Sequence, residues 1–276
     1  MGELMLGGGG SATMPLAIEC DVAESSVCAP ETVNELFEFA PIFGQINRTI
    51  ILMFLASLIV VAVLFVAYRA PKLVPTKFQA AVDAVVRFVR DEVAVGIIGP
   101  EGIKYAPYLL SLFLFILVSN IFEVTPFINF PITSRMAIPL FLALLTWVIF
   151  VVAGIRKQGL AYFGHIIWPP GVPVAIKPLL GIIEFVSIFL IRPFSLAVRL
   201  FANMVAGHVM LSILLVSGVL FIAAIPEVGA KGLFGIAWFA LALAIFLFEI
   251  LVSVLQAYIF TLLSAVYIQT SVHPEH

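Results

Sequence analysis

The chain has 276 residues, of which 63% are hydrophobic and 11% are Asp, Glu, Lys or Arg, and its mean hydropathy is +1.19. A soluble domain is about 45–50% apolar and about 25% charged, so this composition excludes a water-soluble globule and predicts an all-α polytopic membrane protein. A net charge of −2 without a polybasic segment argues against nucleic-acid binding. The only cysteines are Cys20 and Cys28, whose pairing stays open, and no Cys/His cluster has zinc spacing, so we expect no metal and no cofactor.

Five apolar regions are each long enough to cross the hydrocarbon core, which takes about 20 helical residues. They are residues 49–68, 106–122, 137–155, 178–225 and 233–270. The last two exceed the length of an upright crossing and contain charged residues. We therefore expect five membrane-spanning helices, the last two of them long, tilted and carrying the function.

Basic residues predict the orientation, because they concentrate on the cytoplasmic side of membrane proteins. Residues 1–47 contain no Lys or Arg, whereas five basic residues occur between positions 69 and 90. The N-terminus is therefore expected outside and the C-terminus in the cytoplasm, across a bacterial plasma membrane, with the mitochondrial inner membrane as the alternative. The expected divisions are an extracytoplasmic segment (1–47), a first transmembrane helix (48–70), a cytoplasmic-side amphipathic helix (71–104), a transmembrane hairpin (105–157), a cytoplasmic loop (158–177) and a tilted two-helix unit (178–276).

Six apolar residues between the first two spans recur at helical spacing on one face, with charged side chains opposite them. Pro75 precedes them, where the start of a helix tolerates proline. The pattern predicts an amphipathic helix in the membrane interface, and packing on a partner is the alternative. The six residues are Phe78, Val82, Val85, Val86, Val89 and Val93.

Arg199 lies in the middle of the fourth region, where a charge in the bilayer is costly. No carboxylate stands within one helical turn of it, so any ion pair has to come from another helix or another subunit. Asn203 follows at i+4 on the same face, and small residues nearby allow close approach of a neighbour. Snorkelling to a headgroup is the alternative. The central position instead favours a fixed positive charge that faces a titratable group.

Three other polar residues of this region each have two interpretations. Arg192 either shares the face of Arg199 or snorkels to the interface, next to a proline at which we expect a kink. Glu184 either lines an aqueous vestibule or pairs with Lys177 or Arg192. His208 stands nine residues after Arg199, which at 100° per residue places it on the opposite side of the helix. There it either packs through a hydrogen bond or meets the next helix.

The fifth region carries a polar stripe on an otherwise apolar helix. Glu249, Ser253, Gln256 and Tyr267 fall near one line, at spacings of 4, 7 and 18 residues from Glu249. Such a stripe serves either helix–helix hydrogen bonding or the wall of a water path. Glu249 favours the water path, because an ionisable acid among apolar neighbours has little use as a packing residue. A Glu and a His on neighbouring helices form a pair suited to passing protons.

Two stretches of the chain resemble the signature motifs of the a subunit of rotary F-type ATP synthases. They are residues 193–208, PFSLAVRLFANMVAGH, and residues 255–263, LQAYIFTLL. Residues 75–79 and 120–126 fall where that family has an amphipathic helix and an outer hairpin turn. The resemblance extends over residues 40–271.

The resemblance implies a membrane stator with two aqueous half-channels, which pass protons to and from the carboxylates of a c-ring. Arg199 would separate the half-channels. His208 and Glu249 would line the outer one, and Glu184 would line the cytoplasmic one. The implied proton-translocating residues are Arg199, Asn203, His208, Glu249, Gln256 and Glu184, supported by Arg192, Ser253, Glu123 and Tyr267.

The chain departs from many bacterial members of the family, which carry an acid at the position of His208 and a His at that of Glu249. Here the two are exchanged, as in mitochondrial members. The implied partners are the c-ring, the b-type subunits of the peripheral stalk and membrane lipid. No phosphate-binding glycine loop occurs, so we expect a component that neither binds nucleotide nor acts as an enzyme on its own. A stand-alone ion channel or secondary transporter is the alternative, against which the absence of internal repeats argues.

Overall fold

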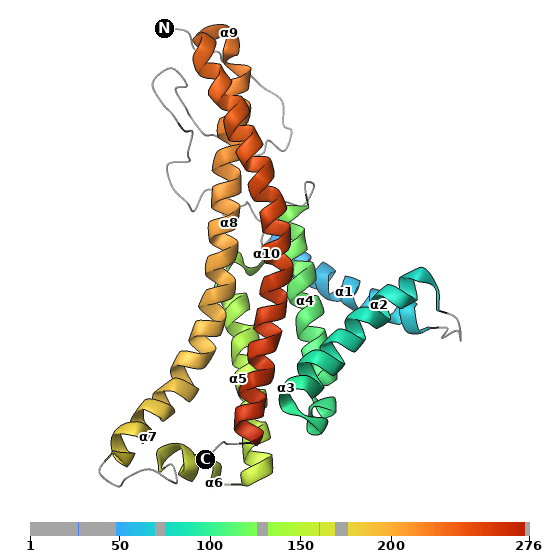
Figure 1. Cartoon of the computed structure of the whole chain (residues 1–276), viewed down its shortest axis with the longest axis vertical. Helices are drawn as coiled ribbons and strands as arrows, with labels where there is room; N and C mark the ends of the chain where they lie inside the picture. The colour runs from blue at the N-terminus through green and yellow to red at the C-terminus, as the bar shows by residue number, and fades with distance from the viewer. Residues whose placement is uncertain are drawn as a thin grey trace.

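The computed structural model describes residue 27 and residues 48–69, 75–125, 132–159, 161–168 and 176–273, and these residues form helices and no β-strand (Figure 1). Five helical segments among them are long and apolar enough to cross a membrane. The predicted all-α fold with five spans is therefore confirmed, whereas Cys20 and Cys28 lie outside the described residues. The five segments are α1 (Arg48–Tyr68), α4 (Ala106–Val124), α5 (Ala137–Gln158), Lys177–Ala223 and Gly229–Val272.

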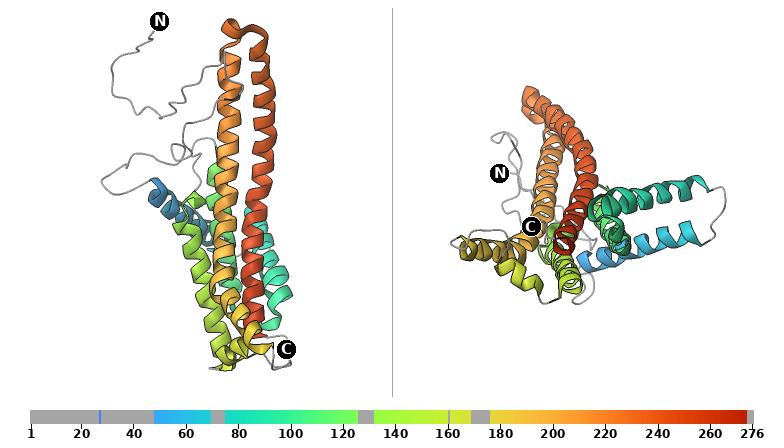
Figure 2. Two further views of the ribbon diagram at one scale, coloured as in Figure 1. Left: turned by 90° about the vertical axis from the view of Figure 1, so that its left-hand side faces the viewer. Right: turned by 60° about the horizontal axis from the view of Figure 1, so that its bottom comes forward.

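The last two segments form a long antiparallel hairpin whose two main helices lie side by side in every view (Figures 1 and 2). Helix α8 has 32 residues and helix α10 has 40. At about 1.5 Å per residue they are about 48 and 60 Å long, well beyond a hydrocarbon core of about 30 Å. The hairpin consists of α7 (Lys177–Val186), the π-helical segment η5 (Ser187–Ile191), α8 (Arg192–Ala223), α9 (Ile225–Val228), the 3-10 segment η6 (Gly229–Gly232) and α10 (Leu233–Val272).

The expected kink lies at the junction of α7 and α8. Figure 1 shows α7 turning away from the line of α8 at the end of the hairpin opposite α9. Between the two helices, the N–H of Arg192 donates to the carbonyl of Ser187, a spacing of five residues that widens the helix. Pro193 has no N–H to donate, so the helical ladder is already interrupted where the direction changes.

At the α9 end, the hairpin is closed by glycines at the contact of α8 and α10. A methyl group on Gly218 would lie 2.9 Å from the backbone nitrogen of Phe239, and one on Gly235 would lie 2.7 Å from that of Ile222. Only residues without a side chain let two helix backbones approach this closely. The two helices are therefore fixed against each other near α9.

The predicted amphipathic helix forms α2 (Lys77–Arg87) and continues into the π-helical segment η2 (Phe88–Val95). The hydroxyl of Thr76 caps its start by accepting a hydrogen bond from the N–H of Gln79, at 3.3 Å. Val89 and Val93 of the predicted apolar face are buried in the same core cluster as residues of α4, while Phe78 at its start is exposed. Part of the face thus packs on the chain itself. The short α3 (Gly96–Ile98) and η3 (Pro100–Lys104) lead into α4.

The main core lies where α4, α5, α8 and α10 meet. Large apolar side chains from all four helices are fully buried there, which accounts for the stability of the bundle. The 3-10 segment η4 (Ile132–Ser134) precedes α5, and α6 (Ala161–Ile167) packs on α7. Buried representatives are Leu109, Ile116, Phe150, Leu196, Leu200 and Phe260.

Helices α1 and α2 form a separate arm. They lie side by side and extend across the direction of α8 and α10 rather than along it (Figures 1 and 2). The hydroxyl of Tyr68 at the end of α1 donates to the Asp83 carboxylate of α2, at 2.7 Å. Because α1 crosses the direction of the long hairpin, the two cannot both stand upright in one bilayer.

Candidate functional site

The predicted polar stripe of α10 faces the interior of the bundle. Glu249 is 3% exposed, and Ser253 and Gln256 are also buried. Glu249 Oε1, Ser253 Oγ and Gln256 Nε2 have no hydrogen-bond partner among the described residues. Buried polar atoms normally have a partner, so these three groups mark a place where bound water would be accommodated.

The carboxyl group of Glu249 lies directly on the backbone of α8. A methyl group on Gly207 would lie 1.7 Å from Oε1 of Glu249 and 2.5 Å from its Cδ. The next residue, His208, is 4% exposed and lies on this same buried side of α8. The structure thus brings Glu249 of the fifth span to the helical turn that carries His208, as the sequence predicts.

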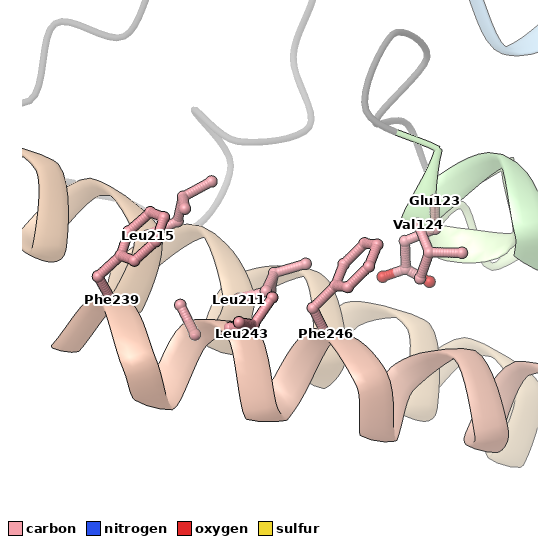
Figure 3. A pocket seen from close by; sticks show the side chains of 8 residues that line it. Glu123, Val124, Leu211, Leu215, Phe239, Leu243 and Phe246 are labelled. Atoms are coloured by element: carbon pink, nitrogen blue, oxygen red, sulfur yellow. The ribbon is translucent and has the colours of Figure 1, made fainter. Parts of the chain in front are cut away.

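A second buried carboxyl group reaches the same level from α4. Glu123 is 1% exposed, neither of its oxygens has a partner among the described residues, and it lies close enough to Glu249 for their charges to interact. It borders a cavity of about 220 Å³, and Figure 3 shows its carboxylate directed toward Phe246 of α10. The other lining residues are Val124, Leu211, Leu215, Phe239, Ala242 and Leu243.

Asn120 connects α4 to the stripe, a role that the sequence analysis missed. Its Nδ2 donates to the backbone carbonyl of Ser253 at 3.3 Å, and its Oδ1 accepts from the hydroxyl of Thr133 at 3.5 Å. The available signal was an amide three residues before Glu123, on the same face of an apolar helix. Asn120 therefore ties α4, which carries Glu123, to α10, which carries Glu249.

Further along α10 the buried hydroxyl groups are hydrogen-bonded. Ser264 donates to the carbonyl of Phe260 at 2.8 Å, and its oxygen lies 3.5 Å from that of Thr146 in α5. The Thr146 hydroxyl is in turn 2.6 Å from that of Tyr108 in α4. These contacts hold three helices together and pair the hydroxyl groups beyond the segment of α10 that runs from Glu249 to Gln256.

Arg199 lies on the side of α8 that faces away from the bundle. It is exposed in this chain, as are Ala202 and Ala206 on the same face, and Asn203 is half-buried with its Nδ2 unpaired among the described residues. Arg199 forms no ion pair in the described part of the chain, where the salt bridges are Arg90–Asp91 and Lys157–Glu101. His208 and Arg199 thus occupy opposite sides of α8, as their nine-residue spacing predicts.

At the α7 end of the hairpin, Arg192 bridges α8 and α10. Its Nη1 donates to the hydroxyl of Thr270 at 3.1 Å, and its guanidinium carbon lies 5.2 Å from the centre of the Tyr267 ring. The Tyr267 ring packs edge-on against Phe150, at 5.9 Å between centroids. Tyr267 therefore contacts Arg192 instead of continuing the Glu249 stripe.

Glu184 is half-buried in α7, close enough to Tyr162 of α6 for their charges to interact. It belongs to neither of the two salt bridges of the described residues, so the alternative of a pair with Lys177 or Arg192 is not formed. The ammonium group of Lys177 lies 5.5 Å from the centre of the Trp168 ring instead. In the described part of the chain, no three His, Cys, Asp or Glu side chains are grouped as metal ligands.

The model of the family described as ATP synthase A chain matches residues 50–269. The chain is similar to ATP synthase subunit a of Frankia alni, with 42% identity over 84% of this chain and 79% of the relative. It is also similar to the subunit of that name from Gluconacetobacter diazotrophicus, with 39% identity over 89% of this chain and 99% of the relative.

A third relative, ATP synthase subunit a of Rhodococcus erythropolis, is 38% identical over 84% of each chain. The match to the family model includes both stretches that carry the resemblance and reaches from the first span to the fifth. The chain belongs to the ATP synthase subunit a family.

Proposed function

We propose that this protein is the stator subunit of a proton-translocating ATP synthase, in which it passes protons to and from carboxylates of a rotating c-ring. The observation that carries the proposal is the arrangement around α8. The exposed Arg199 lies on one side, and the buried groups Glu123, His208 and Glu249 lie on the other. A fixed cation and a path of titratable groups are thus kept apart by one helix.

The surroundings of Arg199 support a protein partner that brings a carboxylate. An arginine exposed to lipid near the centre of a span costs about 2.5–3.5 kcal/mol on insertion scales. Ala202 and Ala206 beside it are small enough to admit a neighbouring helix at close range. A ring of helices with one membrane carboxylate each satisfies both conditions.

The outer half of the path runs from the cavity beside Glu123 to Glu249 and His208. A proton taken up there is handed to a ring carboxylate, which becomes neutral and turns into the lipid. After nearly a full rotation, that carboxyl group reaches the region of Glu184 and releases its proton to the cytoplasmic side. Arg199 favours this release because its charge stabilises the carboxylate, and the same charge repels a proton that would otherwise cross directly.

The length of the long hairpin is consistent with this arrangement. If α1 spans the bilayer upright, α8 and α10 lie strongly tilted, because α1 extends across their direction (Figure 2). A tilted pair presents more of its length to a ring of upright helices than an upright pair does. The peripheral-stalk b-type subunits and lipid then cover the remaining faces. The synthase carries out its nucleotide chemistry in other subunits.

Arg199→Ala tests the proposal directly. In inverted membrane vesicles that contain the whole synthase, we expect ATP-driven proton pumping to fall on the order of 100-fold, the scale of losing a key charge. Passive proton conduction should persist, since removing Arg199 joins the two half-channels. The matched control is Arg87→Ala, at an exposed arginine of α2, which should leave pumping unchanged.

Pumping that survives Arg199→Ala, in vesicles with the normal amount of subunit, would contradict the stator proposal. A stand-alone channel or transporter predicts a different result, namely conduction by vesicles that contain this chain without the ring subunit.

A further inference from the structure

The cavity between α4, α8 and α10 has a more apolar lining than bound water alone would need. It measures about 220 Å³, and among the eight described residues that line it only Glu123 has a polar side chain. A bound water makes about two to four hydrogen bonds to polar partners. Water can therefore be held at the Glu123 carboxyl group, whereas the rest of the volume is suited to an apolar molecule.

The Glu123 carboxyl group forms the polar wall of this cavity. It is almost fully buried, and neither oxygen has a hydrogen-bond partner among the described residues. Figure 3 shows it directed toward the Phe246 ring, which lines the same cavity. A cation that donates hydrogen bonds stabilises a buried carboxylate, and an aromatic ring also attracts a cation. Glu249 lies close enough to add the attraction of a second carboxylate, so this end of the cavity favours a cationic group.

The volume of the cavity limits the size of the ligand. A cavity of about 150 Å³ holds one benzene molecule, and sites for drug-sized ligands have about 300–1,000 Å³. The cavity of about 220 Å³ therefore accommodates one aromatic ring with a short aliphatic chain. Leu215 of α8 and Leu243 of α10 line it and are exposed, so it can be reached from the surface of this chain.

We propose that this cavity binds a small lipophilic amine, with the ammonium group on the Glu123 carboxylate and an aromatic ring among the apolar side chains of α8 and α10. The cavity lies on the outer half of the proton path, so the effect of the amine on transport rests on the proposed function. A bound amine displaces water from Glu123 and holds its carboxylate in an ion pair. Protons then no longer pass from the cavity to Glu249.

Binding is measured first, without any readout of transport. The probe is radiolabelled 2-phenylethylamine, which combines one ring, a short chain and an ammonium group, in equilibrium dialysis against the purified whole synthase. We expect saturable binding of one amine per copy of this chain. The neutral isostere 2-phenylethanol should compete about tenfold more weakly or worse, because it lacks the charge that the Glu123 carboxylate recognises.

Two substitutions test the polar and the apolar part of the site separately. Glu123→Gln keeps the shape of the side chain but removes its charge, and it should weaken amine binding about tenfold or more. Leu243→Trp should weaken binding to a similar extent, because it adds a larger ring at an exposed position of the lining. The matched control is Leu247→Trp, one turn further along α10 at an exposed residue outside the lining, which should leave binding unchanged.

The site and its effect on transport have separate outcomes. The absence of saturable binding, equal binding of the alcohol, or unchanged binding in Glu123→Gln or Leu243→Trp overturns the site. ATP hydrolysis by the purified coupled synthase measures the effect, and saturating amine should slow it on the order of tenfold in the wild type and in Leu247→Trp, whereas the alcohol should not. Amine bound in the cavity with hydrolysis unchanged would confirm the site and contradict the proton path through the cavity, which belongs to the proposed function.

Discussion

Two polar regions along the long hairpin differ in how far their charged groups are buried and in whether those groups have partners. At the first, the carboxyl level formed by Glu123, His208 and Glu249, the groups are nearly fully buried, and both carboxyl groups have oxygens without hydrogen-bond partners among the described residues. At the second, the arginine end formed by Arg192, Tyr267 and Thr270, the charge is partly exposed and contacts both other residues.

The difference indicates a division of tasks between these two regions. A buried carboxyl group without a partner contributes little to packing and costs free energy, so its presence suggests a role in transport. An arginine that donates to a hydroxyl and lies over an aromatic ring contributes to holding two helices together. We therefore expect substitutions at the carboxyl level to affect transport, and those at the arginine end to affect stability first.

The largest effect is expected from Glu249→Gln. The amide keeps the size of the side chain but cannot carry a proton between neighbours, and the loss of one proton-transferring group costs on the order of 100-fold or more. ATP-driven pumping in inverted vesicles measures this loss. Ser253→Ala, one turn along the same stripe, should have a much smaller effect. Equal effects of the two substitutions would remove Glu249 from the path.

A smaller effect is expected at the arginine end. Arg192→Gln removes the contact with the Tyr267 ring, and Thr270→Val removes the hydrogen bond while keeping the shape, each at a cost of about 0.5–1 kcal/mol. Thermal denaturation of the purified complex should show a modestly lower Tm, with most of the pumping activity kept. A loss of pumping by Arg192→Gln as large as that of Glu249→Gln would place Arg192 in the path and erase the contrast.

The smallest effect is expected outside the spans, at the exposed Glu101. A hydrogen bond from Lys157 lowers the pKa of the Glu101 carboxyl group below its ordinary value of 4.5. Because the folded-state pKa is the lower one, the pair stabilises the fold at pH values above 4.5 and loses this contribution as the pH falls through the folded-state pKa. Glu101→Gln should thus lower the Tm slightly at neutral pH, and the difference should vanish in acid. A difference that grows in acid would contradict this sign.

Helical periodicity was sufficient to predict the features that belong to a single helix. It placed Arg199 and His208 on opposite sides of α8, because residues nine apart differ by half a turn. It also identified Glu249, Ser253 and Gln256 as one stripe. Each of these follows from 100° per residue without any knowledge of the neighbouring helices.

Contacts between helices were not accessible in this way. Gly207 and Asn120 lie within stretches that carry the resemblance, but their contacts depend on how α4, α8 and α10 are rotated and shifted against one another. The same holds for Tyr267, which lies near the stripe in projection but contacts Arg192 because it is 18 residues beyond Glu249 along a long helix. Small rotations of each turn add up over such a distance.

The glycine contact of Gly218 and Gly235 also has a mechanical consequence. At one end of the long hairpin it fixes the backbones of α8 and α10 against each other. At the other end the hydrogen bond from Arg192 to Thr270 joins the two helices, and the carboxyl level lies between these contacts. Two helices joined at both ends resist bending far better than two helices that are not joined. A c-ring that exerts a sideways force on the middle of this hairpin would therefore deform it little, and the torque would drive rotation instead of bending the stator.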